Sequence, residues 1–588
     1  MTRDQIEERY KWKLEDIFPD DEEWEREYRE TEAMIPDLAA LKDSIATGAS
    51  ELYEGLKKIE KANFHMERLI VYSSMRKDED GKVSKYQAQT SRAQSLAVRL
   101  GSTLAYLDPL LLEIPEETMK KYIEDPQLKE FSFELSKILR KKEHILSEKE
   151  ERILAGVGEF ADGPQEIFGM LNNADMDFGI IHHNGEDLPL SHASYFEYLS
   201  SGDRELRKKA FKQYYDTYRK NIHTIAATYS NSVKKDVFYA RARGYESAME
   251  AALFEDDVPL SVYHDLIDNV HNNLDTMHEY MELRKKVLAA DDMQMYDIYA
   301  PLMDTAEYKY SFEQARDMVL SALPILGDDY IEILKTAFTD RWIDVYETPG
   351  KRSGAYSWGV YGTHPYVLLN HRNDLDSVFT LAHELGHSMH TYFSNASQPY
   401  STSGYVIFVA EVASTVNEIL LTKYLLRTTE DKELKKYVLN HYIDQFRTTV
   451  LRQTMFAEFE MMSHEEIEKG NALTVDSMNE MYFKLNSLYH GKAMGDDRTI
   501  SYEWARIPHF YNAFYVYKYA TGFSCASAIV SKLESDPSMK ERYRRFLCAG
   551  GSKFPIDILG DASINVGEAV DLCMKEFRRA LEEFKTLV

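Results

Sequence analysis

Long stretches of this 588-residue chain contain neither glycine nor proline. It has 27 glycines and 16 prolines, well below the average combined usage of about 12%. Residues 203–243, 260–300 and 405–469 lack both, and the last interval is long enough for two or three consecutive helices. Between Tyr263 and Met277, apolar residues recur with the spacing of a helix that buries one face. The sequence therefore predicts a mostly α-helical protein.

One region departs from this pattern, between Ser353 and His371. Glycines and a proline there separate short aromatic and β-branched runs, which predicts a small hairpin or sheet. Its second run, residues 366–370, could be an exposed edge strand that binds an extended peptide by strand addition. The alternative is an ordinary edge covered by a loop.

The charge balance limits the partners of the chain. Its formal net charge is −28, with no basic stripe to offset it, so we expect no nucleic-acid partner. The amino terminus lacks the apolar core of a signal peptide, and no run approaches the roughly 18 apolar residues of a membrane span. We therefore expect a cytoplasmic protein with no membrane partner.

The strongest chemical signal is His383-Glu384-Leu385-Gly386-His387, an H-E-x-x-H pattern in a predicted amphipathic helix. His383 and His387 lie one turn apart on one helix face, so both imidazoles can bind a single zinc ion. Glu384 then lies beside the ion without binding it, which suits a general base for water. The alternative is two histidines hydrogen-bonded in a helical core. The pattern should arise by chance only roughly 0.05 times in such a chain, which favours the zinc site.

A zinc site of this kind needs a third ligand. The metzincin pattern is excluded, because the position of its third histidine is Phe393. A glutamate from a following helix is the other common arrangement. Glu411 lies in an apolar run, where an ionised carboxylate is costly to bury unless it is paired or binds a metal. We therefore predict Glu411 as the third ligand. Glu418 either orients a ligand histidine or is a plain helix-surface carboxylate, and His390 and Asp376 have weaker claims.

Hydrolysis of a peptide also needs donors for the oxyanion that forms when water attacks the carbonyl. Residues 504–522 are rich in aromatic side chains, and the candidate donors among them are His509, Tyr515, Tyr517 and Tyr519. The alternative, favoured by spacing alone, is an aromatic helix packed in the core.

Several segments together resemble the thimet oligopeptidase family of zinc metallopeptidases, and within it the branch of bacterial oligoendopeptidase F. These segments are residues 12–18, 352–357, 383–390, 411–414 and 507–522. The resemblance implies a mostly α, elongated multi-helix body with a deep substrate channel and a small sheet beside the zinc-binding helix.

The resemblance also implies roles for single residues. One Zn²⁺ ion would be held by His383, His387 and Glu411, with Glu384 as general base and later proton donor. The segment from His509 to Tyr519 would supply the transition-state donors. Aligning residues 514–517 on the family's tyrosine pattern favours Tyr517, with Tyr515 and Tyr519 as alternatives.

The sequence therefore predicts a zinc endopeptidase that hydrolyses internal bonds of short unstructured oligopeptides. We expect a helical amino-terminal domain, residues 1–202, and a catalytic domain, residues 203–588. One alternative is a zinc carboxypeptidase or dipeptidase on a similar helical fold, with Arg352 or Arg506 binding the substrate carboxylate. Another is a non-catalytic helical peptide-binding protein, against which the intact Glu384 argues.

Overall fold

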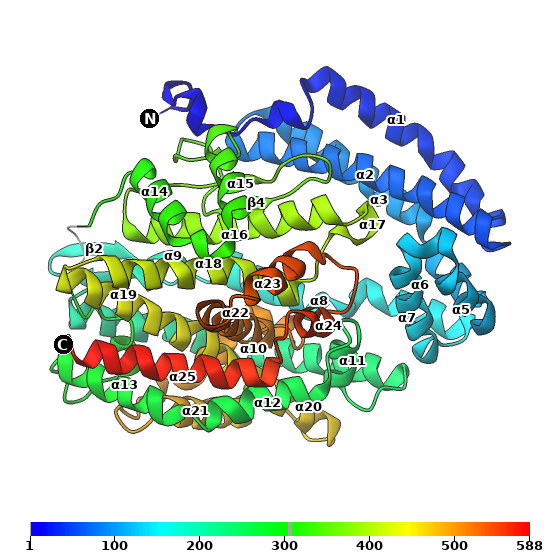
Figure 1. The fold of residues 1–588 in the computed structure, drawn as a ribbon. Helices are drawn as coiled ribbons and strands as arrows, with labels where there is room; N and C mark the ends of the chain where they lie inside the picture. Colours follow the sequence, from blue (N-terminus) through cyan, green and yellow to red (C-terminus); the bar gives the residue numbers. More distant parts are fainter. Residues whose placement is uncertain (1, 304–307) are drawn as a thin grey trace. The chain divides into compact units, whose positions relative to one another are not determined.

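The computed structural model describes residues 2–303 and 308–588, and helices dominate this part of the chain, as predicted (Figure 1). The chain forms two compact units. Unit 1 comprises Met1–Glu143, Tyr308–Tyr424 and Ile529–Ser563, and unit 2 comprises His144–Glu307, Leu425–Ala528 and Ile564–Val588. The domain boundary expected at residue 202 stays a prediction. Among the described residues, no helix combines the length and apolarity required to cross a membrane.

Unit 1 holds the amino-terminal helices and the helix of the H-E-x-x-H motif. Its helices are α1 (Asp21–Ala40), α2 (Ala49–Glu79), α3 (Ser84–Leu104), α4 (Leu107–Glu113), α5 (Glu116–Glu124), α6 (Ser132–Lys141), α14 (Phe312–Ala322), α15 (Asp328–Thr339), α16 (Leu375–Ser397), α17 (Tyr400–Ser403), most of α18 (Ile407–Thr428), α23 (Met539–Cys548) and α24 (Pro555–Asp561).

Unit 2 is also helical. Its helices are α7 (Glu148–Ala161), α8 (Gly163–Met170), α9 (His192–Leu199), α10 (Arg204–Ala242), α11 (Ala248–Phe254), α12 (Leu260–His271), α13 (Leu274–Val287), α19 (Lys432–Gln445), α20 (Arg452–Glu468), α21 (Val475–His490), most of α22 (Tyr517–Ser535) and α25 (Val566–Lys585). Its strands β1 (Ile180–His183) and β2 (Glu186–Pro189) form an antiparallel pair.

The intervals without glycine and proline are largely helical, as predicted, except that residues 288–300 form turns and one short 3-10 helix. Residues 203–243 coincide with α10, and 405–469 hold α18, α19 and α20 in succession. The apolar stripe predicted between residues 260 and 300 is buried in α12, where Tyr263, Leu266 and Val270 are fully enclosed. Periodicity therefore located the buried faces correctly.

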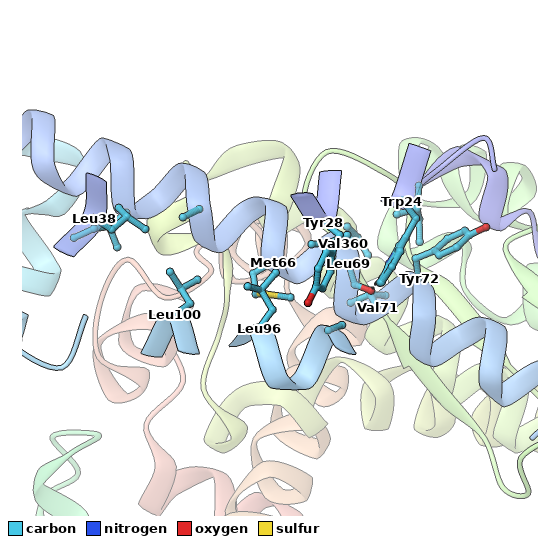
Figure 2. Close-up of a cluster of buried hydrophobic side chains, with 14 of the residues drawn as sticks. Trp24, Tyr28, Leu38, Met66, Leu69, Val71, Tyr72, Leu96, Leu100 and Val360 are labelled. Carbon is cyan, nitrogen blue, oxygen red and sulfur yellow. Dashed lines mark hydrogen bonds between the residues drawn. The ribbon is translucent and has the colours of Figure 1, made fainter. Parts of the chain in front are cut away.

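A hydrophobic core joins α1, α2 and α3 in unit 1 (Figure 2). Trp24 of α1 is fully buried, and its indole Nε1 donates to the carbonyl of Leu69 in α2 at 3.0 Å. Val360, Tyr366 and Leu368 extend the same core to the sheet region. One face of α2 is thus fixed in the core, and this holds the rest of that helix in place.

The region predicted as a hairpin or sheet forms β4 (Tyr356–Trp358) and β5 (Tyr366–Leu368), joined by the short β3 (Ile343–Asp344). The strand order is β3-β5-β4, with β5 parallel to β3 and antiparallel to β4. The predicted edge strand is therefore wrong, because β5 lies in the middle of this sheet and is fully buried. β4 is an edge of the sheet instead, and α16 packs against both β4 and β5.

Candidate metal and catalytic site

The helix of the H-E-x-x-H motif is α16, and its start is set by Asp374. The Asp374 side chain caps the helix by accepting from the Ser377 backbone N–H at 2.8 Å. Leu381 and Leu385 are fully buried and fix the helix against the interior of unit 1. The histidines of the motif are partly exposed, with 27% of the His383 side chain and 18% of the His387 side chain accessible.

His383, His387 and Glu411 come together in the structure. The two Nε2 atoms are 3.1 Å apart, and Oε2 of Glu411 lies 3.5 Å from Nε2 of His383 and 3.8 Å from Nε2 of His387. Ligands at 2.0–2.1 Å from a tetrahedral zinc ion are separated by about 3.3 Å. This donor set of two imidazoles and one carboxylate therefore fits a zinc ion in size and in chemistry.

Glu411 reaches the histidines because α18 approaches α16 very closely. A Cβ atom on Gly386 would lie 2.5 Å from Cα of Ser414 and 2.6 Å from the Ala413 carbonyl oxygen. The backbones of the two helices are therefore in direct contact, which only glycine permits at this position. Glu411 lies three residues before Ser414 in α18, so this close contact brings it next to the two histidines of α16.

Glu418 hydrogen-bonds the ring of His383, at 2.5 Å between Oε1 and Nδ1. The sequence allowed two interpretations of Glu418, as a residue that orients a ligand histidine or as a carboxylate on the helix surface. The contact with His383 matches the orienting role. A carboxylate on Nδ1 fixes the tautomer that presents Nε2 to a metal. The neighbouring Asn417 donates to the Ala382 carbonyl at 3.1 Å and so adds a second bond between α18 and α16.

Glu384 is 7% exposed and lies beside the three-residue group without joining it. Burial raises the pKa of its carboxyl group to about 7, with Glu411 and Glu418 acting in the same direction and His383 opposing. The Ser357 backbone in β4 hydrogen-bonds the carboxylate. A carboxyl group with a pKa near neutrality can both accept and release a proton, as a general base requires.

The two histidines differ in their surroundings. Burial disfavours the charged form of His383, but the hydrogen bond and charge of Glu418, together with the charges of Glu384 and Glu411, outweigh it and raise the pKa to about 9. Burial and the nearby His383 lower the pKa of His387 to about 3. The two imidazoles therefore differ in how readily they hold a proton.

The weaker candidates do not join this group. His390 is 1% exposed and stacks on the ring of Tyr405, with centroids 3.7 Å apart. Burial lowers its pKa to about 3, which is typical of a neutral core histidine. Asp376 is an exposed residue in the first turn of α16.

The predicted oxyanion donors lie in unit 2. His509 is exposed, and Tyr515 and Tyr519 are partly exposed and form an aromatic cluster with it. Tyr517, the first residue of α22, is 1% exposed and packs against Tyr263. The structure thus groups His509 with Tyr515 and Tyr519, while Tyr517 faces the core of unit 2.

A turn at Phe514 separates His509 from the three tyrosines along the chain. Phe514 has a φ of 54°, in the left-handed region, and its backbone N–H donates to the buried carboxyl of Glu460 at 2.8 Å. Glu460 is fully enclosed, and burial raises its pKa well above the usual value. This buried contact fixes the path of the chain between His509 and α22.

Sequence reasoning missed the contribution of β4. The Ser357 backbone binds Glu384, and its hydroxyl group hydrogen-bonds that of Ser388 at 2.8 Å. The only signal was that residues 352–357 belong to a segment of the family resemblance. It also missed the close helix approach at Gly386, for which the glycine within the motif was the signal.

Comparison with known proteins gives the family. Residues 197–574 match the model of peptidase family M3, and residues 111–178 match the oligopeptidase F model. Oligopeptidase PepF of Bacillus subtilis is 43% identical over 583 residues, covering 98% of this chain and 87% of that protein. Group B oligopeptidase PepB of Streptococcus agalactiae is 38% identical, with coverage of 100% and 98%. The structure of oligoendopeptidase F from Enterococcus faecium aligns with a TM-score of 0.75 at 35% identity, covering 96% of this chain and 99% of that chain.

Two histidines and a glutamate are a donor set that metal-dependent hydrolases use. The chain belongs to peptidase family M3. It is therefore a metalloendopeptidase, as the sequence predicted.

Proposed function

We propose that this enzyme hydrolyses internal peptide bonds of short unstructured oligopeptides with a single zinc ion held by His383, His387 and Glu411. The observation that carries the proposal is the convergence of these three ligand atoms beside the buried carboxyl of Glu384. The names of the relatives, which are oligopeptidases, support the substrate class. The cytoplasmic location expected from the sequence stays a prediction.

Different residues of the chain have different roles in the proposed hydrolysis. A bound zinc ion supplies a Lewis acid that acidifies water and polarises the carbonyl group. Glu384 accepts the proton of the attacking water on its carboxylate and then gives it to the leaving amine. Glu418 holds the His383 ring in orientation through Nδ1.

The donors to the oxyanion are proposed from the family resemblance. His509, Tyr515, Tyr517 and Tyr519 are the candidates. Because a donor must reach the substrate, the exposure of His509 and the partial exposure of Tyr515 and Tyr519 favour them over the buried Tyr517.

The surroundings of two arginines favour internal cleavage over the carboxypeptidase alternative. Arg506 is buried against Glu503 at 2.8 Å, and Arg352 pairs with Asp78 at 3.2 Å. Each arginine is already paired with a carboxylate of the protein, and this pairing weakens the attraction that it could exert on a substrate carboxylate.

The test is product mapping by mass spectrometry on a mixture of unstructured peptides, with the wild type and Glu384→Gln. We expect internal cleavage by the wild type, its loss with 1,10-phenanthroline, and a fall of at least about 10³-fold in kcat for Glu384→Gln at unchanged zinc content.

Two outcomes contradict the proposal. Wild-type cleavage by a zinc-loaded Glu384→Gln enzyme would remove Glu384 from the mechanism. Stepwise loss of terminal residues would select the carboxypeptidase or dipeptidase alternative.

A further inference from the structure

A groove lies within unit 1 and is lined by α2, α4, α6, β4, α16 and α17; we call it the α2–α16 groove. Its volume is about 730 Å³, within the range of roughly 300–1,000 Å³ that ligand sites occupy. Its apolar wall residues include Leu56, Leu111, Phe131, Leu135 and Trp358. Buried core residues of α2 such as Met66 and Leu69 hold this helix in place (Figure 2), and Ile59 belongs both to that core and to the groove lining.

The α2–α16 groove begins beside the predicted metal ligands. Thr391 lines it and lies one helical turn beyond His387 on the same face, about 6 Å further along α16. Ser357 also lines it, and this residue binds Glu384 through its backbone and Ser388 through its hydroxyl group. Thr391 and Ser357 therefore place part of the groove lining next to residues that neighbour the predicted metal ligands.

The lining is acidic. Its charged residues, among those that the structure describes, are carboxylates without a lysine or arginine: Glu60, Glu67, Asp108 and Glu134. Two of them are compensated by cations that do not line the groove, since Lys57 contacts Glu60 and Lys137 lies 2.7 Å from Glu134. Asp108 is exposed to solvent.

Glu67 is half-buried, like Glu60 and Glu134, but it differs from these two because no cation acts on its carboxyl group. The groups that influence its carboxyl are the hydroxyl of Tyr400 and the backbone of Tyr361, and burial raises its pKa to about 7. Its Oε2 atom is buried with no hydrogen-bond partner in the described parts of the chain. A buried carboxylate oxygen without a partner is costly, and a ligand that supplies a cation removes that cost.

We propose that Glu67 is a specificity determinant that binds a positively charged side chain, arginine or lysine, of a peptide lying in the α2–α16 groove. The inference rests on the proposed function. A guanidinium or ammonium group supplies the donors and the charge that Oε2 lacks, and the apolar walls pack its methylene stem. The exposed or paired carboxylates around it add a weaker attraction.

The test uses one neutral cleavable peptide in which a single arginine is moved through each position, and a matched series with citrulline at the same positions. Citrulline keeps the shape of arginine but has no charge. The ratio of kcat/KM for arginine over citrulline is measured for the zinc-loaded wild type, Glu67→Gln, and the control Glu117→Gln. Glu117 is an exposed carboxylate on α5 that does not line the groove.

We expect the wild type to favour arginine at least about tenfold at one position, as a charge-assisted hydrogen bond allows. Glu67→Gln should reduce that ratio to about one while cleaving the citrulline peptide normally, and Glu117→Gln should leave the ratio unchanged. As a second variant, Glu67→Lys should reverse the preference toward a glutamate at that position.

Equal cleavage of both series by the wild type would overturn the inference and leave the proposed function intact. An equal loss on both series in a folded Glu67→Gln enzyme would also overturn it, because it would show a structural role. Cleavage of neither series by the wild type would instead count against the proposed function itself.

Discussion

Glu384 and Glu418 belong to neighbouring helices of unit 1, and their contacts give them different roles at the same group. Glu384 is buried beside the predicted ligands and has a pKa of about 7, whereas Glu418 is bonded to Nδ1 of His383. The first can move a proton, and the second holds a ring in orientation. The difference arises from one contact, which residue type alone does not reveal.

The contact between Glu418 and His383 predicts an effect on metal affinity. Glu418→Ala should weaken zinc binding about 100-fold, and Glu418→Gln, which keeps an acceptor but not the charge, about tenfold. Competition with a chelating indicator measures both constants. Glu541→Gln, at an exposed position on α23, is the control. Unchanged zinc affinity in Glu418→Ala would show that the orienting contact has no energetic role.

The predicted ligands come from two helices, His383 and His387 from α16 and Glu411 from α18, and the close crossing of these helices brings them together. His383 and His387 follow from helical spacing within α16, but Glu411 joins them only because Gly386 lets the α18 backbone approach. The Asn417 bond to the Ala382 carbonyl and the Glu418 bond to His383 lie along the same crossing. The crossing thus positions both the predicted ligand Glu411 and the contact between Glu418 and His383.

Gly386→Ala should disrupt this crossing. The new methyl group would lie 2.5 Å from Cα of Ser414, so the helices must separate, at a cost of about 1–3 kcal/mol. We expect a lower unfolding temperature together with weaker zinc binding, measured by calorimetry and metal titration. The matched control is Gly101→Ala in α3, where nothing lies within 4 Å and the helix should gain stability. Equal effects of the two variants would contradict a tight crossing.

At the scale of the whole molecule, the predicted ligands sit on long helices that are already packed in unit 1. Leu381, Leu385 and Val412 are fully buried around them, so we expect the core to form without a metal. This differs from small zinc domains, in which metal binding supplies the folding free energy.

Metal removal should therefore abolish cleavage without unfolding the protein. After treatment with 1,10-phenanthroline, we expect the helical far-ultraviolet circular dichroism signal to persist, the unfolding temperature to fall, and zinc addition to restore both activity and thermal stability. Loss of the helical signal on chelation would show that the metal is needed for folding.

The net charge of the whole chain does not describe the charge that a bound substrate would meet in the α2–α16 groove. From the net charge of −28 we expect no polyanionic partner, but this total does not say where a substrate meets carboxylates. The α2–α16 groove, which Thr391 of the H-E-x-x-H helix also lines, concentrates carboxylates at one place, and no cation acts on one of them, Glu67.

Much of this protein is determined by its sequence. The scarcity of glycine and proline predicted helices, apolar periodicity located buried faces such as that of α12, and the H-E-x-x-H spacing placed two histidines on one turn. These features depend on contacts between residues close in the chain, so a period or a motif is enough to reveal them.

Tertiary structure decided what depends on residues distant in sequence. It placed β5 in the middle of a sheet, because the pairing of β5 with β3 involves a strand more than twenty residues earlier. It gave Glu418 a partner on another helix and buried Tyr517 while leaving Tyr515 partly exposed. It also brought α2 and α16, three hundred residues apart in the chain, to the walls of one groove. Such contacts are set by packing in three dimensions, which local sequence patterns do not encode.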